Sequence, residues 1–248
     1  MSGHSKWSTI KRQKGAADIK RGQTFTKIAN AIIIAVKMGG SGDPGANPRL
    51  RAALDEARSL NMPKENIQRA IDRGLGLGKE ALEEVIFEGF GPGKVAFLIE
   101  AVTDNRLRTL QEVKNLFERS GGSLAGQGSV SYMFDRIGEI KVSKKADILT
   151  LIDLGAEDVE EIEQGYLVYV QSSELNTMST KITQAGYEVE SAETVMKPKI
   201  LQKIDDPELA KKVIEFTEKL EDNPDIQKVY ANFDIPENIT WGVAQVDT

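Results

Sequence analysis

The sequence predicts an α+β fold that begins with helices and continues with a mixture of strands and helices. Apolar residues recur at helical spacing within residues 1–75, and the periodicity changes to that of strands after residue 79. Between these regions, Gly74–Gly78 holds three glycines in five residues, which favours a hinge. A chain of 248 residues has room for two or three compact domains.

Three helices are predicted for residues 1–75, which form the first domain. Each carries an apolar stripe at helical spacing and is bounded by a glycine or proline signal. The stripes run from Phe25 to Val36, from Leu50 to Leu60 and from Ile67 to Ile71, and the signals are Gly39 with Gly40, Pro63 and Gly74.

Residues 79–134 and 205–248 are predicted to form a second domain, an α/β sandwich. Its strands are bounded by turn residues, and its helices show an amphipathic pattern. The predicted strands are Val85–Glu88, Lys94–Val102, Ser129–Phe134 and Ile226–Ala231, and the predicted helices are Arg106–Ser120 and Pro207–Leu220.

Residues 135–204 are predicted to form a third domain that is inserted into the second. The order of its elements is βαββαβ, the ferredoxin-like plan. The predicted strands are Glu139–Val142, Asp158–Glu163, Tyr166–Val170 and Tyr187–Val195, and the predicted helices are Ala146–Leu154 and Ser173–Ala185.

The net charge of −6 conceals a strong asymmetry along the chain. Residues 1–75 hold 14 Lys and Arg against 6 Asp and Glu, a net charge of +8, so the remainder carries −14. This pattern indicates a basic module that binds nucleic acid or a membrane surface, joined to acidic domains. No apolar run approaches the roughly 20 residues of a membrane span, and no secretory signal is evident. We therefore expect a cytoplasmic protein with nucleic acid, and no membrane, as its partner.

Several classes of chemistry are disfavoured by composition. The chain has no cysteine, and His4 is its single histidine, so thiolate sites, a Ser-His-Asp triad and multi-histidine metal sites are not expected. Acidic runs such as Glu157–Glu161 are more simply explained as a solvated face of a strand than as a catalytic site. We expect no enzymatic activity, no cofactor and no metal, and no small-molecule substrate is evident.

The basic amino-terminal stretch is the strongest functional signal. Its cations invite phosphate contacts, and Trp7 is suited to stack on a base. The alternative is a solvated basic tail in which Trp7 is simply buried. Basic residues on the second and third helices extend the stretch only if the helices pack so as to align them. The nucleic-acid-binding residues predicted on this basis are Lys6, Trp7, Lys11, Arg12, Lys14, Lys20, Arg21, Lys27, Lys64, Arg69 and Arg106.

Two further motifs resemble phosphate sites. Thr103–Thr109 lies where a strand gives way to a helix and contains two arginines, an arrangement that can hold phosphate. We favour the simpler interpretation, that an Asp or Asn of this motif caps the helix. The glycine-rich segment Gly121–Ser129 lacks the lysine of a P-loop, so nucleotide binding is not expected there.

A set of longer motifs resembles the YebC/PmpR family, almost from end to end of the chain. One departure is Phe90, where many relatives have tyrosine. The motifs are Gly3–Trp7, Lys37–Gly40, Asp43–Pro44, Asn47, Asn61–Ile67, Glu88–Gly93 and Thr103–Asn105.

The resemblance implies three domains around a cleft, a cytoplasmic location in bacteria, and DNA-binding transcriptional regulation. It also implies a link to translation, because mitochondrial relatives are translational activators and bacterial members have been linked to ribosomes and to proline-rich sequences. We therefore expect a non-enzymatic, nucleic-acid-binding regulator of gene expression. The alternative is a translation factor that binds the ribosome through ribosomal RNA and assists difficult, proline-rich synthesis. Phosphate binding serves both functions and does not select DNA over RNA.

Overall fold

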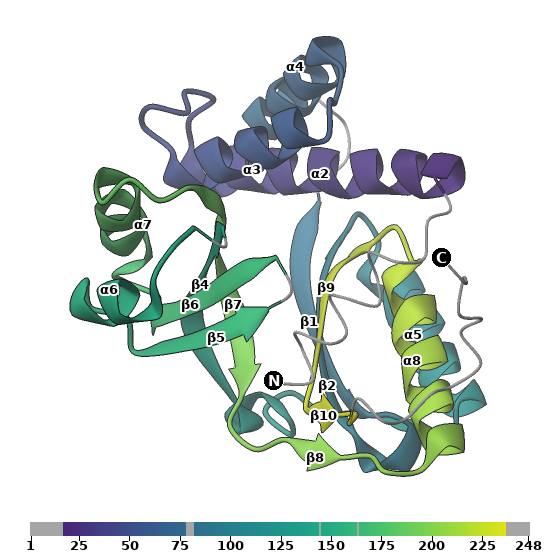
Figure 1. The fold of residues 1–248 in the computed structure, drawn as a ribbon. Coiled ribbons are helices and arrows are strands. Elements are labelled where there is room, and N and C mark those ends of the chain that lie inside the picture. The colour runs from purple at the N-terminus through teal and green to yellow at the C-terminus, as the bar shows by residue number, and fades with distance from the viewer. Residues whose placement is uncertain (1–16, 78–81, 144, 163, 237–248) are drawn as a thin grey trace. The chain divides into compact units, whose positions relative to one another are not determined.

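The computed structural model describes residues 17–77, 82–143, 145–162 and 164–236, with side chains from residue 22 onward (Figure 1). The described residues fall into two compact units. One holds residues 17–131 and 205–231, and the other holds residues 132–204 and 232–236. Helices come first and antiparallel sheets follow, so the predicted α+β class is confirmed. The finer division into three domains stays a prediction.

The first unit begins with the three predicted helices, α2 (Ala17–Gly39), α3 (Pro48–Ser59) and α4 (Lys64–Asp72). Their apolar stripes meet in one core, to which α2 contributes the buried run from Ile32 to Val36. No helix among the described residues is long and apolar enough to cross a membrane.

Asn47 fixes the start of α3 against α2. Its side-chain oxygen accepts a hydrogen bond from the backbone N–H of Leu50 at 3.0 Å, which caps the helix. Its amide nitrogen donates to the carbonyl oxygens of Ala35 at 2.8 Å and Ser41 at 3.1 Å. The side chain is only 3% exposed, so one buried amide joins the end of α2, the connecting loop and the start of α3.

The glycine-rich segment after α4 is in part a packed turn rather than a hinge. Residues Arg73–Leu77 continue α4 as a wide helical turn, in which Gly76 has a φ of 92°. A Cβ atom on Gly74 would lie 2.6 Å from the Cβ of Val36 and 2.8 Å from the carbonyl oxygen of Ile33. Glycine at this position therefore lets the turn approach α2 closely.

The first unit continues with a four-stranded antiparallel sheet in the order β3-β1-β2-β9. Helices α5 (Arg106–Arg119) and α8 (Pro207–Glu221) lie side by side against it (Figure 1). Phe97 of β2, Phe117 of α5 and Phe216 of α8 meet edge to face in the core between them. The strands are β1 (Glu83–Phe90), β2 (Ala96–Thr103), β3 (Ser123–Ala125) and β9 (Ile226–Ala231).

The predicted strand Ser129–Phe134 is wrong. The chain instead forms a turn and a short 3-10 helix at Ser131–Met133, and the next strand begins only at Phe134. The backbone N–H groups of Val130 and Ser131 are bound by the buried carboxylate of Glu88, so they are not free to pair with a neighbouring strand. The three-residue strand β3 was not predicted, because it lies within a glycine-rich sequence.

The second unit has the ferredoxin-like order of elements that the sequence predicts. Its antiparallel sheet has the order β5-β6-β4-β7, and its core contains Ile140, Val168 and Ile182. Two short strands pair in parallel, which places residues 232–236 with this unit. The elements are β4 (Phe134–Ser143), α6 (Ile148–Asp153), β5 (Asp158–Ile162), β6 (Gly165–Gln171), α7 (Leu175–Gln184), β7 (Val189–Pro198), β8 (Gln202–Lys203) and β10 (Phe233–Asp234).

Candidate nucleic-acid interface

An open depression lies between α2 and α4, which Figure 1 shows lying across one another within the first unit. Its volume is about 290 Å³. Its lining combines polar and basic groups with apolar groups, and none of the described residues that line it carries a carboxylate. The lining residues are Phe25, Thr26, Ala29, Asn30, Met62, Asn66, Arg69, Ala70 and Arg73.

Helix α4 brings its polar groups to the depression from one face. Asn66, Arg69 and Arg73 are three and four residues apart, so they follow one another along the same side of the helix. The guanidinium of Arg69 donates to the side-chain oxygen of Asn66. Lys64, the first residue of α4, is exposed on the same helix. The helix also carries Glu65 and Asp72, but the residues of α4 that line the depression include arginines and no carboxylate, as a phosphate contact requires.

The three arginines of α3 are bound to acceptors of their own chain. Arg49 forms an ion pair with Glu84 of β1, and Arg58 pairs with Asp55 at 2.9 Å. Arg51 donates to the carbonyl oxygens of Pro44 and Gly45 in the loop that precedes the helix. Their contacts are those of exposed positions that support the local fold.

The predicted site residues fall into five groups. Those from Lys6 to Lys14 lie outside the described residues, and Lys20 and Arg21 lie in α2 without described side chains. Arg69 lines the depression, and Lys64 lies on the same helix. Lys27 is half-buried and donates to the carbonyl oxygen of Glu221 at the end of α8, so this amine joins two helices. Arg106 is exposed at the start of α5.

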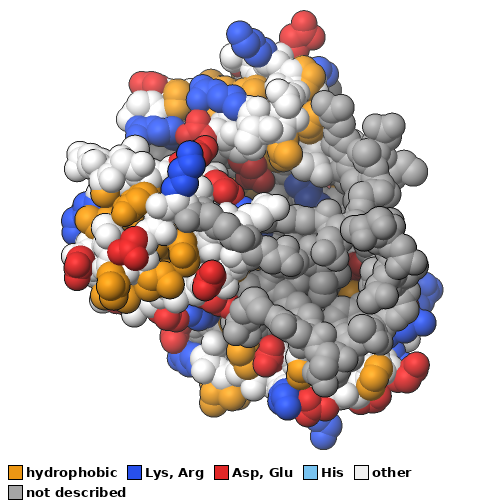
Figure 2. Space-filling model, viewed as in Figure 1, with side chains coloured by type: hydrophobic (Ala, Val, Ile, Leu, Met, Phe, Trp, Pro, Cys, Tyr) orange, Lys and Arg blue, Asp and Glu red, His pale blue; other side chains and the backbone are white. Residues whose placement is uncertain are grey.

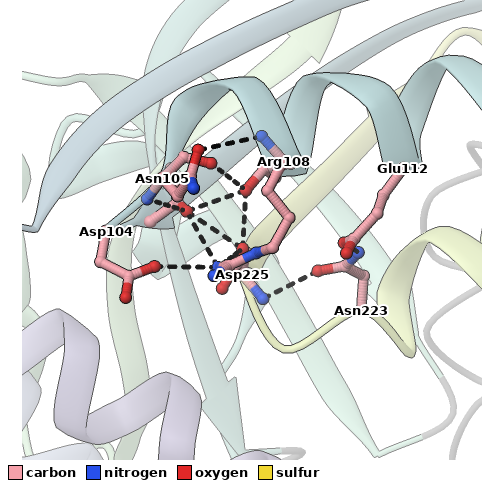
Figure 3. Close-up of polar contacts among 8 residues, drawn as sticks. Asp104, Asn105, Arg108, Glu112, Asn223 and Asp225 are labelled. Carbon is pink, nitrogen blue, oxygen red and sulfur yellow. Dashed lines mark hydrogen bonds and ion pairs between the residues drawn. The ribbon is translucent and has the colours of Figure 1, made fainter.

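The motif around Arg106 is a structural cap, as the simpler interpretation predicts. Asn105 caps α5 by accepting from the backbone N–H of Arg108 at 3.1 Å. The guanidinium of Arg108 binds Asp104 at 2.9 Å and Asp225 at 2.7 Å (Figure 3). Both arginines of this motif are exposed, but Arg108 is committed to two carboxylates.

Asp225, in the loop before β9, is the centre of this network. Its carboxylate accepts from the hydroxyl groups of Thr109 at 2.6 Å and Thr103 at 3.1 Å as well as from Arg108. Burial alone would raise the pKa of Asp225, but the hydrogen bonds from Thr109, Arg108 and Thr103 outweigh it and hold the pKa below 3.8. These hydrogen bonds connect the end of β2 and the start of α5 to a loop that lies more than 100 residues later in the sequence.

Glu88 occupies the position that a phosphate would take in the glycine-rich segment. Its carboxylate accepts from the backbone N–H groups of Gly128 at 2.8 Å, Val130 at 2.6 Å and Ser131 at 2.8 Å. Burial alone would raise the pKa of Glu88, but these backbone hydrogen bonds lower it overall. A carboxylate of the protein itself already satisfies these donors, which removes the resemblance to a phosphate cradle.

Of the nine lining residues, only Arg69 was among the predicted site residues, and the residues that were missed include Phe25, Asn30, Asn66 and Arg73. Asn30 carried a signal, because it is the polar residue that interrupts the apolar run from Ala29 to Val36. Within the described residues, no group of three or more His, Asp or Glu side chains is placed to hold a metal ion. Figure 2 shows Lys and Arg side chains over the helices at the top of the view, with Asp and Glu among them.

Comparison with known proteins gives two family models that match nearly the whole chain. The model described as the TACO1/YebC protein N-terminal domain matches residues 5–77. The model described as the TACO1/YebC second and third domain matches residues 82–233.

Individual relatives match over the same length. A probable transcriptional regulatory protein of Geobacter sulfurreducens is 48% identical and covers 95% of this chain and 96% of its own. A probable transcriptional regulatory protein of Chloroflexus aurantiacus is 50% identical, with coverage of 95% and 96%. The crystal structure of a conserved hypothetical protein from Aquifex aeolicus superimposes with a TM-score of 0.83 at 42% identity, covering 91% of this chain and 96% of that one.

Proposed function

The chain belongs to the TACO1/YebC family, and from this premise we propose that it is a non-enzymatic, cytoplasmic regulator of gene expression that binds nucleic acid through its amino-terminal helices. The observation that carries the proposal is the segregation of charge. Residues 1–75 carry +8 and the remainder carries −14. A polyanion is therefore attracted to one end of the chain and repelled by the other.

The contact surface we propose has two parts. One is the surface of α4 with the depression beside it, where Lys64, Arg69 and Arg73 supply positive charge. The other is the basic sequence from Lys6 to Arg21, in which six of the predicted residues lie besides Trp7. Phosphate contacts from such residues position a protein on nucleic acid but do not by themselves choose a sequence.

Transcription is the process that the names of the relatives support, and on that basis DNA is the first candidate target. Contacts of the described helices favour the alternative, a ribosome-bound translation factor. The arginines of α3 bind their own chain, and the polar row of α4 lines a depression. Neither helix therefore presents the unobstructed row of side chains that reads a major groove. A recessed basic surface suits irregular RNA, whose bases are displayed singly.

Crosslinking in cells, followed by sequencing of both the DNA and the RNA that are recovered, tests the proposal and separates its two forms. A variant in which Lys11, Arg12 and Lys14 are all changed to Glu provides the comparison, and cosedimentation with ribosomes provides a second readout. Enrichment of promoter DNA that the variant loses supports transcription. Enrichment of ribosomal RNA, with cosedimentation that the variant loses, supports translation. If neither DNA nor RNA is enriched over the variant, the proposed function is wrong.

A further inference from the structure

We propose that one face of the sheet in the second unit binds the basic amino-terminal segment of the same chain, residues 1–16, in competition with nucleic acid. The docking goes beyond the proposed function, and only the competition rests on it. We call this surface the acidic sheet face. It carries Asp158 and Glu160 of β5, Tyr169 of β6, Glu139 of β4 and Glu193 of β7.

The strand register places these side chains on one face. A row of directly opposed residues crosses all four strands, and its members are Asp158, Tyr169, Glu139 and Glu193. Opposed residues of neighbouring strands lie on the same face of a sheet. The residues that alternate with them, such as Val168, form the core with α6 and α7. The two helices therefore pack on the opposite face.

An apolar cluster on the acidic sheet face is buried although the helices lie on the other side. Ile162, Leu167 and Tyr169 are 8%, 8% and 4% exposed. Among the described residues, the partly buried apolar residue that packs against them is Ile137, which belongs to the same sheet. An apolar sheet face is stabilised by an element packed on it, and α6 and α7 do not supply that element here.

Two cations on this face are each matched by a carboxylate. Lys197 forms an ion pair with Asp158 at 2.9 Å, and its amine lies 3.5 Å from the centre of the Tyr169 ring. Lys141 forms an ion pair with Glu190. These lysines therefore offset two carboxylates of their own surroundings and leave the charge of the other carboxylates on this face to be balanced.

Three further carboxylates, those of Glu139, Glu160 and Glu193, make the face acidic. Glu160 accepts a hydrogen bond from the hydroxyl of Tyr169 at 3.1 Å. Burial raises the pKa of Tyr169, and the neighbouring charges of Glu139 and Glu160 raise it further, so the hydroxyl stays a donor. Attraction of a basic segment depends on the sum of these charges, and a carboxylate that already accepts one hydrogen bond has capacity for more.

Residues 1–16 match this face in charge, in apolar content and in reach. They hold no Asp or Glu and four cations, which are Lys6, Lys11, Arg12 and Lys14. Trp7 and Ile10 supply apolar side chains suited to cover the cluster. An extended segment of this length spans up to about 50 Å. Nucleic acid attracts the same cations, so it competes with the acidic sheet face for this segment.

The test applies a zero-length carbodiimide crosslinker to the full-length protein without nucleic acid and identifies the linked peptides by mass spectrometry. This reagent joins a lysine amine to a carboxylate that it contacts. The links that report docking run from Lys6, Lys11 or Lys14 to Glu160. Mixing unlabelled and isotopically labelled protein shows whether a link joins residues of one chain or of two.

A double variant, Glu139→Gln with Glu193→Gln, lowers the charge of the face and keeps Glu160 available for crosslinking. The matched control is Glu208→Gln with Glu215→Gln, which removes the same charge from exposed positions of α8. Circular dichroism melts check folding. The single variant Glu193→Gln, at an exposed position, replaces the double variant if the latter unfolds.

We expect links to Glu160 within one chain, reduced about threefold by the sheet-face variant, the scale of losing two exposed ion pairs, and unchanged by the control. Duplex DNA added in excess should also reduce them. The inference is wrong, while the proposed function stands, if the links are absent, form only between chains, fall equally in both variants, or persist when DNA is bound. If the protein binds no DNA, the proposed function fails, and the links alone decide whether the segment docks.

Discussion

Replacing Glu88 with Gln should loosen the segment that follows β3 and leave the rest of the sheet in place. The carboxylate of Glu88 is 3% exposed and binds three backbone N–H groups, those of Gly128, Val130 and Ser131. Gln has the same shape but keeps one acceptor oxygen. In its best orientation the amide oxygen retains the bonds from Val130 and Ser131, and the amide nitrogen faces the N–H of Gly128.

The expected cost follows from these three bonds. A hydrogen bond to a charged group contributes about 1.5–3 kcal/mol and a neutral one about 0.5–1.5 kcal/mol. Losing one charged bond and weakening two others would remove about 3.5–6 kcal/mol. Relief of the buried charge offsets part of that loss, because a charged group is costly to remove from water. We expect a net destabilisation of about 2–3 kcal/mol.

The loss of stability caused by Glu88→Gln should depend on pH, because folding lowers the pKa of Glu88. A carboxylate with a lowered pKa stabilises the fold fully above the ordinary value of 4.5, and this stabilisation is lost as pH falls through the lower, folded value. The difference between wild type and Glu88→Gln should therefore be constant near neutral pH and shrink in acid.

Hydrogen exchange of the peptide that spans residues 121–131, measured across this pH range, checks the prediction. Exchange should be faster in Glu88→Gln at neutral pH, and thermal melts should show a lower transition. Glu83→Gln is the control, because Glu83 is exposed on the same strand. Equal exchange in wild type and Glu88→Gln, or a difference in stability that persists unchanged into acid, would refute the reasoning.

Four other substitutions test individual positions by thermal or denaturant unfolding. Asp225→Asn should lower the free energy of unfolding by about 1–3 kcal/mol at neutral pH and by less in acid, because folding also lowers the pKa of Asp225. A loss of stability that does not depend on pH would contradict this. Asn47→Ala should cost about 2–4 kcal/mol, since it removes a cap and two buried hydrogen bonds; a cost under about 0.5 kcal/mol would show that these bonds are dispensable. Gly74→Ala should cost about 1–3 kcal/mol by overpacking, whereas Gly22→Ala, which has open space within α2, should stabilise by up to about 1 kcal/mol; equal effects would contradict the close approach.

Much of the fold was predictable because its signals are local. Helices α5 and α8 differ from their predicted ranges by one residue at one end, and strand β9 has the range that was predicted. Each combines a regular apolar period with a clear start, such as the Asp206 cap before α8. The prediction of a strand at Ser129–Phe134 was wrong because the residue that determines the conformation of this segment, Glu88, lies about 40 residues earlier in the chain. Periodicity within a short window carries no information about such a partner.

The candidate site was only partly predictable for the same reason. Counting charges identified Lys64 and Arg69, but it gave Lys27 the same weight, although the amine of Lys27 binds a carbonyl oxygen 194 residues away. The depression itself depends on how α2 and α4 cross, which the spacing within either helix does not determine. Asn30 was not predicted, although the sequence holds a signal for it, as a polar interruption in an apolar run.

The measurement that tests the central claim most directly is the salt dependence of nucleic-acid binding by the full-length protein. If about four to six phosphates are neutralised on duplex DNA, the slope of log K against log salt should be near −4 to −5. Changing Lys64 and Arg69 together to Gln should reduce the magnitude of that slope by about 2, roughly 0.9 for each lost contact. Changing Lys145 and Lys211, which are exposed and lie beyond the basic region, together to Gln removes the same charge and should leave the slope unchanged. A flat salt response, or equal effects of the two double variants, would contradict binding through the amino-terminal helices.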